Sequence, residues 1–131
     1  MKYNDAKKLI EWLCSAFEFE RNAVYESEDG KIAHAHLTYK NSMIMLGSTD
    51  NGSEYSDLVK QPMDIGSYET QSPYIIIDKD EIETHYENAK SQGAEIVLEL
   101  KVEDYGGKNY SCKDPEGHLW NFGSYNPWDK D

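Results

Sequence analysis

The segment that decides the fold runs from residue 110 to residue 122 and reads YSCKDPEGHLWNF. Its centre, Asp114-Pro115-Glu116-Gly117, has the composition of a type I turn, in which Asp caps the first position, Pro presets φ and Gly suits the fourth position. Strand-forming residues flank the turn on both sides, over residues 108–113 and 119–125. The segment therefore predicts an antiparallel hairpin that ends the chain's last sheet.

The residues before this hairpin complete one module. A short apolar run at 74–77 predicts a strand, and residues 81–92 predict a helix that ends at Gly93. The apolar face of that helix carries Ile82, His85, Tyr86 and Ala89. A further strand is expected over 95–102, and Gly106-Gly107 is typical of a hairpin turn. The second half thus reads strand, helix and three strands.

The first half shows a similar order. Residues 4–17 predict a helix with Asn4 or Asp5 as its N-cap, because apolar residues recur at steps of three and four. Its buried stripe consists of Ala6, Leu9, Ile10, Leu13, Cys14 and Phe17. Strands are expected over 22–26, 32–39 and 43–46, and residues 47–72 have no sustained period. If a strand of a few residues precedes Asn4, both halves have the same order of elements.

The two halves also match locally. MIMLGS at 43–48 aligns without gaps on LWNFGS at 119–124, and both segments are the last strand of their half. The sequence therefore predicts one α+β domain over 1–131. It consists of a first module of about 1–48, a connecting loop over 49–72 and a second module over 73–131.

Charge and composition exclude several roles. The formal net charge is −12, from 25 acidic and 13 basic side chains, and such a field repels phosphate backbones and anionic lipids while it attracts cations. Nucleic acid and membranes are therefore not expected as partners. No segment is apolar enough for an export signal or a membrane span, and Cys14 and Cys112 are expected as reduced thiols. These features predict a cytoplasmic protein.

Four features together resemble the vicinal-oxygen-chelate superfamily of glyoxalase, bleomycin-resistance and dioxygenase-like proteins. They are the closing hairpin around Asp114-Pro115-Glu116-Gly117, the repeated module, a helix that opens at Asp5-Ala6 and closes over 16–20, and a strand carrying His34-Ala35-His36. The resemblance implies two βαβββ modules whose curved mixed sheets enclose a cavity. In that family the cavity is usually completed across a homodimer, so a second copy of the chain is an expected partner.

Strand alternation predicts which side chains line such a cavity. If the first helix covers Leu37, Ile44 and Leu46, the opposite face carries His34, His36, Met43 and Met45. In the second module Trp120 and Phe122 are expected to pack on the helix, which leaves Tyr110, Cys112, Leu119 and Asn121 on the cavity side. These eight residues are the candidate ligand-binding set. The loop 49–71 is expected to cover the ligand with Tyr55, Met63 and Tyr68.

The sequence lacks the metal ligands that the metal-dependent enzymes of this superfamily use. Those enzymes hold a divalent ion with His or Gln from the first strand and Glu from the last strand of each module, whereas the last-strand positions here hold Met45 and Asn121. Residues 73–77 offer no such ligand, and Tyr3 is the one first-strand candidate of the first module. His34 and His36 could share a metal only with a third ligand. We therefore expect neither a metal nor another cofactor.

Two classes of function remain. The sequence favours a metal-free protein that binds an organic small molecule, aromatic or antibiotic-like, against Met43, Met45 and Tyr110. The alternative is a metal-dependent lyase, isomerase or dioxygenase of the same superfamily, and His36 could act there as an acid or base. Simple core packing by Met43 and Met45 is an equal alternative to binding. A pure dimerisation module is the third interpretation.

Overall fold

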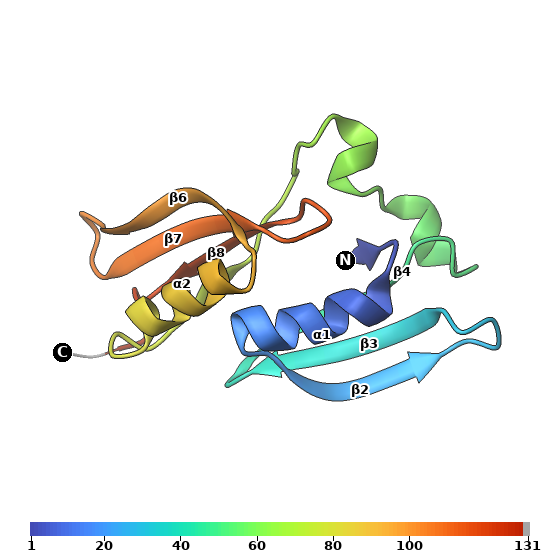
Figure 1. The fold of residues 1–131 in the computed structure, drawn as a ribbon, viewed down its shortest axis with the longest axis horizontal. Coiled ribbons are helices and arrows are strands. Elements are labelled where there is room, and N and C mark those ends of the chain that lie inside the picture. Colours follow the sequence, from blue (N-terminus) through green and yellow to red (C-terminus); the bar gives the residue numbers. More distant parts are fainter. Residues whose placement is uncertain (130–131) are drawn as a thin grey trace. The chain divides into compact units, whose positions relative to one another are not determined.

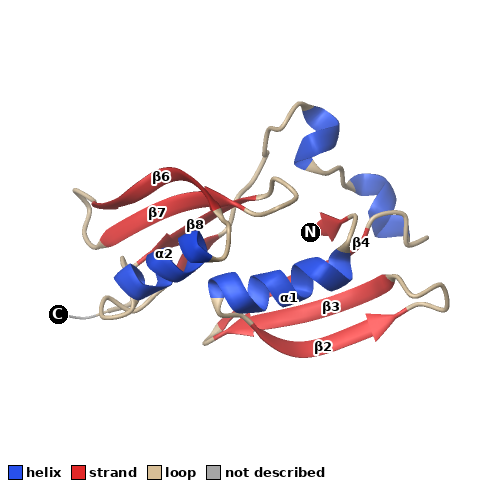
Figure 2. Ribbon diagram, in the orientation of Figure 1, coloured by secondary structure: helices blue, strands red, loops and turns tan. Residues whose placement is uncertain are grey.

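The computed structural model describes residues 1–129 of the chain. The chain forms two compact units, one over residues 1–68 and the other from residue 69 onward. Each unit holds a four-stranded mixed sheet with one helix against one face (Figures 1 and 2). The predicted α+β fold of two βαβββ modules is therefore confirmed. The assignment of the whole chain to a single domain stays a prediction.

The first unit begins with a strand of two residues, β1 (Lys2–Tyr3), followed by α1 (Ala6–Phe17). Three strands follow, β2 (Glu20–Glu26), β3 (Ile32–Tyr39) and β4 (Ser42–Ser48). Their order in the sheet is β1-β4-β3-β2, with β1 parallel to β4 and the other pairs antiparallel. Two 3-10 helices, η1 (Glu54–Leu58) and η2 (Pro62–Ile65), interrupt the loop that the sequence left without structure.

Helix α1 forms where its capping and apolar periodicity predict it. The carboxylate of Asp5 accepts a hydrogen bond from the backbone N–H of Lys8 at 3.2 Å, which makes Asp5 the N-cap. The buried helix residues are Ala6, Leu9, Ile10, Leu13, Ala16 and Phe17. They pack against Leu37, Ile44 and Leu46 of the sheet, and these strand residues are buried as well. Cys14 lies at the margin of the buried stripe and is partly exposed.

The second unit repeats this arrangement. It consists of β5 (Tyr74–Ile76), α2 (Ile82–Ser91), β6 (Glu95–Val102), β7 (Lys108–Lys113) and β8 (Leu119–Gly123). The sheet order is β5-β8-β7-β6, with β5 parallel to β8. The aligned segments 43–48 and 119–124 supply the equivalent strands β4 and β8. The duplication predicted from their sequences therefore extends to their place in the two sheets.

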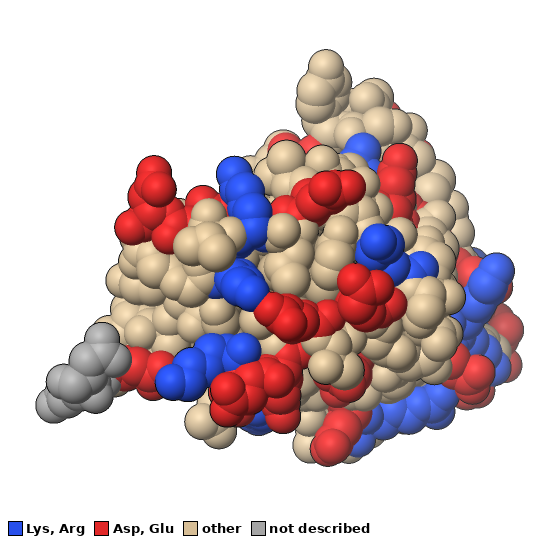
Figure 3. All heavy atoms as spheres, turned by 60° about the vertical axis from the view of Figure 1, so that its left-hand side comes forward, with Lys and Arg blue, Asp and Glu red and all other residues tan. Residues whose placement is uncertain are grey.

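The surface carries the acidic excess in a mixed pattern. Red acidic and blue basic side chains lie interspersed on the face that Figure 3 shows. Some of them form exposed ion pairs, such as Lys7 with Glu26 and Arg21 with Glu11, both at 3.2 Å. None of the helices in the described part of the chain combines the length and apolar character needed to cross a bilayer.

Candidate functional site

The face of the first sheet that turns away from α1 carries the predicted side chains. Met43 is 52% exposed and Met45 46% exposed, and His36 pairs with Met45 across β3 and β4. His34 is exposed and His36 is half-buried. The alternation of β3 and β4 thus places all four residues on one open face. Their role in binding a ligand stays a prediction.

The two histidines of β3 form a close pair on this face. Their Nε2 atoms lie 2.6 Å apart, so one ring donates the hydrogen bond and the other accepts it. Burial lowers the pKa of His34 below its ordinary value, and the positive charges of His36 and Lys2 lower it further. The pair is therefore favoured in a form that carries at most one positive charge.

A hollow of about 370 Å³ lies beside His34 within the first unit. The polar and aromatic side chains of its wall are those of Lys2, His34, Ser53 and Tyr55. The remaining wall is apolar and comes from Met1, Ala33, Met45, Leu46 and Gly47. His36 and Met43 lie on the same face of the sheet but outside this wall. The hollow therefore uses two of the four residues predicted for the first module.

Hydrogen bonds hold the connecting loop against the sheet at this hollow. The Asn51 side chain donates to the carbonyl of Ala33 at 3.0 Å, and Ser53 caps η1 through the backbone N–H of Ser56. Tyr55 follows directly and reaches the wall of the hollow. Met63 and Tyr68, the other two predicted loop contacts, do not line it; they are 49% and 74% exposed.

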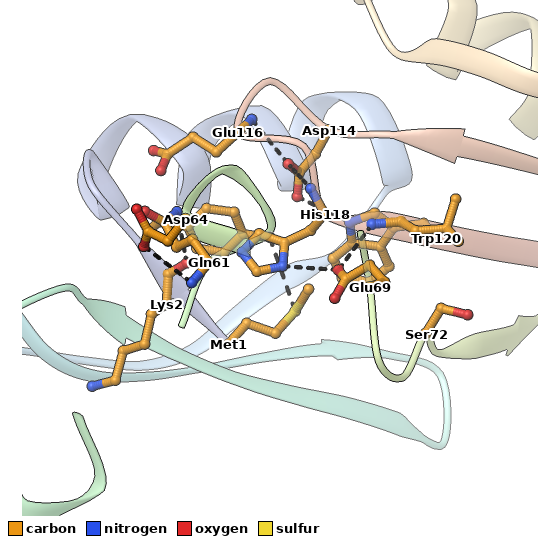
Figure 4. Close-up of polar contacts among 12 residues, drawn as sticks. Met1, Lys2, Gln61, Asp64, Glu69, Ser72, Asp114, Glu116, His118 and Trp120 are labelled. Carbon is orange, nitrogen blue, oxygen red and sulfur yellow. Dashed lines mark hydrogen bonds and ion pairs between the residues drawn. The ribbon is translucent and has the colours of Figure 1, made fainter. Parts of the chain in front are cut away.

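Lys2 is the charged residue of this hollow that the sequence did not reveal. It lies in β1, is only 6% exposed, and its ammonium lies 6.0 Å from the centre of the Tyr55 ring. The Gln61 side chain donates to the Lys2 carbonyl at 3.1 Å and fixes the strand (Figure 4). A two-residue strand is too short to show alternation. In the structure Tyr3 is fully buried, and alternation along β1 turns Lys2 to the other face of the sheet.

In the second unit the predicted orientation of Tyr110 and Cys112 is wrong. Tyr110 pairs with Phe122 and Cys112 pairs with Trp120, so these four side chains share one face of the sheet. Both Tyr110 and Cys112 are buried on the side of α2, where the Tyr110 hydroxyl lies 2.6 Å from Nδ1 of His85. Burial raises the pKa of the Cys112 thiol to about 12, with a smaller contribution from Asp114.

On the open face of the second sheet, the Asn121 side chain forms hydrogen bonds with other residues of the same unit. Asn121 accepts a hydrogen bond from the Ser111 hydroxyl at 2.6 Å and donates to the Ser72 hydroxyl at 2.8 Å and to the Pro73 carbonyl at 3.0 Å. Asn121 therefore ties the segment before β5 to β8, which gives it a structural role. A ligand contact by Asn121 or by the half-buried Leu119 stays a prediction.

The Tyr74 ring fills the neighbouring part of this face. A β-carbon on Gly123 would collide with the Tyr74 phenol, so the absence of a side chain at Gly123 makes room for this ring. The Tyr74 hydroxyl donates to the carbonyl of Tyr125 at 3.1 Å, which holds the ring in place. The equivalent strand position in the first unit is Gly47, which belongs to the wall of the hollow.

The first-strand and last-strand side chains of these faces do not fit a divalent metal. The open-face residues of the first and last strands include Lys2, Met45, Tyr74 and Asn121, which supply an ammonium, a thioether, a phenol and an amide. The divalent ion of the metal-dependent enzymes in this superfamily needs imidazole nitrogens or carboxylate oxygens that converge on one point. Within residues 1–129, no three His, Cys, Asp or Glu side chains come together in a group that could hold an ion. Tyr3, the sequence candidate, is buried away from the open face.

The Asp-Pro-Glu-Gly turn has a structural function. Oδ1 of Asp114 accepts from the backbone N–H groups of Glu116 and His118, at 3.0 and 3.1 Å, and Oδ2 accepts from the Trp120 indole at 3.0 Å. The Glu69 carboxylate in turn accepts from the backbone N–H of Leu119 and lies 3.1 Å from Nδ1 of His118 (Figure 4). These bonds fix the start of β8.

Comparisons with known proteins agree with this architecture. TioX from Micromonospora sp. ML1 is 25% identical, with 96% of this chain and 94% of TioX covered and a TM-score of 0.70. A mutant of the fosfomycin resistance protein FosX from Listeria monocytogenes, solved with Mn(II) and 1S,2S-dihydroxypropylphosphonic acid, is 16% identical, with 97% and 86% covered and a TM-score of 0.66. FosX from Mesorhizobium loti is 11% identical, with 96% and 87% covered and a TM-score of 0.63.

The sequence comparisons identify the family. Among curated proteins, none matches the chain significantly. The model of the Glyoxalase/Bleomycin resistance protein/Dioxygenase superfamily matches residues 2–122, which is nearly the whole chain. The family predicted from the hairpin, the repeated module and the first helix is therefore confirmed. This chain belongs to the glyoxalase/bleomycin resistance protein/dioxygenase superfamily.

Proposed function

We propose that the protein is a metal-free binding protein that holds an organic small molecule, aromatic or antibiotic-like, in the hollow of its first unit. The observation that carries the proposal is this hollow of about 370 Å³, whose wall is mainly apolar and includes the Tyr55 ring. Ligand sites of proteins have volumes of roughly 300–1,000 Å³ and combine apolar walls with a few polar groups. Met45 adds a flexible thioether that adapts to different ligand shapes.

The donor chemistry of the open faces supports binding without a metal. The related FosX structure was solved with Mn(II), but this chain has Met45 and Asn121 in its last strands, and within residues 1–129 no three His, Cys, Asp or Glu side chains form a group that could hold an ion. The second candidate function is a metal-dependent lyase, isomerase or dioxygenase of the superfamily. The observation that favours it is the His34–His36 pair, since two adjacent imidazoles are a common part of metal sites.

A thermal-shift screen tests both candidates. We expect organic compounds, and none of Zn, Ni, Mn or Fe ions, to raise the melting temperature, because a ligand specific to the folded state stabilises it. Met45→Gln should weaken the binding of each hit about tenfold, since it places an amide in the apolar wall. Met43→Gln is the matched control, because Met43 lies on the same face but outside the hollow.

Two results would contradict the proposal. Equal weakening of the hits by Met43→Gln and Met45→Gln would place the ligand outside the hollow. A reproducible stabilisation by one of the metal ions that disappears in His34→Ala or His36→Ala would support the enzyme instead.

A cytoplasmic homodimer is part of the same proposal. The first sheet ends at β2 and the second at β6, and such edge strands are usually covered by a partner. Exposed apolar side chains near these edges include Tyr25, Leu98 and Val102. The two free cysteines fit a reducing compartment.

Light scattering of the purified chain at micromolar concentration should therefore give twice the chain mass of 15.1 kDa. Leu98→Lys on the open face of β6 should lower this mass toward the monomer, because it places a charge in an apolar contact. A monomeric mass for the unaltered protein would overturn this part of the proposal.

A further inference from the structure

The hollow of the first unit differs in charge from the rest of the molecule. Acidic residues make up 25 of the 131 positions, yet among the described residues none of those that line the hollow is Asp or Glu. The ionisable side chains in its wall are those of Lys2, His34 and Tyr55. The acidic excess predicts an attraction for cations, whereas the wall of the hollow carries positive charge. The local charge therefore has the opposite sign to the net charge.

Among these side chains, that of Lys2 supplies the positive charge. Its side chain is almost fully buried, and its ammonium lies 6.0 Å from the centre of the Tyr55 ring, in the same wall. Burial lowers the pKa of Lys2 because the charged form loses its hydration. Its charge also contributes to the lowered pKa of His34. An anion bound beside Lys2 would favour the charged form of the ammonium.

We propose that the hollow selects organic anions, namely compounds that carry a carboxylate on an apolar body. The carboxylate pairs with the Lys2 ammonium, and the apolar body lies against Met45 and the Tyr55 ring. This inference rests on the proposed function and adds the class of ligand to it. Distant surface charges are screened within about 8 Å at physiological salt, so the nearest charge decides the preference.

Three probes with the same apolar body and different charges test the inference. They are 2-naphthoate, the neutral 2-naphthamide and the cation 2-naphthylmethylammonium, each titrated while the NMR signal of the Met45 methyl group is followed. We expect the carboxylate to bind at least about tenfold tighter than the amide, because a charge-assisted hydrogen bond in a partly dry site replaces a neutral one. The ammonium probe should bind most weakly.

Substitutions at Lys2 then assign the preference to its charge. Lys2→Met should remove the preference for the carboxylate, while Lys2→Arg should keep it. Lys8→Met is the matched control, because Lys8 is exposed on α1 and lies outside the hollow, so this variant removes one positive charge from the same unit. The preference should persist in it. Circular dichroism checks the fold of each variant, and if Lys2→Met does not fold, the probe series and Lys2→Arg still decide.

The other outcomes would overturn the selection of anions, the role of Lys2 or the binding function itself. Equal affinities of the three probes, with shifts at Met45, would overturn the selection of anions and leave the proposed binding function intact. A preference that persists in Lys2→Met would overturn the role of Lys2. Absence of any shift at Met45 up to millimolar concentration of all three probes would count against both the selection and the binding function.

Discussion

Trp120→Ala is expected to lower the free energy of unfolding by about 3–5 kcal/mol, the range found for removal of a buried aromatic side chain. Trp120 is fully buried and is the largest of the fully buried side chains. Its ring lies parallel to that of Phe122, with the centroids 6.0 Å apart, and its indole N–H donates to Asp114 at 3.0 Å. The substitution therefore leaves a cavity and removes one hydrogen bond of a buried carboxylate.

Urea denaturation followed by far-ultraviolet circular dichroism measures this loss without relying on tryptophan fluorescence. Trp128→Ala is the control, because Trp128 is 78% exposed and its removal should change stability by less than about 0.5 kcal/mol. Trp120→Phe keeps most of the volume and should cost clearly less than Trp120→Ala. If Trp120→Ala lost no more than Trp128→Ala, the assignment of Trp120 to the core would be wrong.

Asp114→Ala should have the second-largest effect, a loss of about 2–4 kcal/mol, because hydrogen bonds to a charged group contribute more than neutral ones and their removal leaves buried donors without an acceptor. The Asp114 side chain is 4% exposed and accepts from Glu116, His118 and Trp120. Asp114→Asn keeps one acceptor oxygen and should fall between the wild type and Asp114→Ala.

Asp29→Ala provides the matched control for this turn. Asp29 also accepts from a hydroxyl and a backbone N–H within a turn, through Ser27 and Lys31, but it is exposed to water. Its removal should cost much less, because water replaces the lost acceptor. The same denaturation experiment compares the two variants, and equal losses would contradict the view that burial makes the Asp114 turn important.

The elements that depend on local chemistry could be predicted from the sequence. Helix α1 could be predicted from the spacing of Leu9, Ile10 and Leu13 and from the Asp5 cap, because both depend only on residues close in the sequence. In the structure these three residues are buried and Asp5 is the N-cap. The Asp-Pro-Glu-Gly turn likewise formed where its composition predicts it. The bounds of β3, β6 and β7 agree with the predicted ranges, because turn residues on both sides mark their ends.

Which side chains share a face across two strands depends on the register of their pairing. The sequence of one strand alone does not determine that register. In the first unit the two-residue turn at Lys40 and Asn41 pairs His36 with Met45, as the predicted open face requires. In the second unit the longer turn pairs Cys112 with Trp120, so an assignment that separated them was wrong. The position of Lys2 could not be predicted, because it depends on the pairing of β1 with β4, far apart in the sequence.

The equivalent last strands of the two units have different surroundings on their open faces. In the second unit Tyr74 occupies the space over Gly123, so a substitution there acts on folding. In the first unit Met45 is 46% exposed and lines an open hollow, so its replacement leaves the α1 side of the sheet packed and, under the proposed function, acts on ligand binding. If the hollow binds ligands as proposed, substitutions at position 45 can alter binding with little loss of stability, and the first unit is the place to begin directed evolution of new binding preferences.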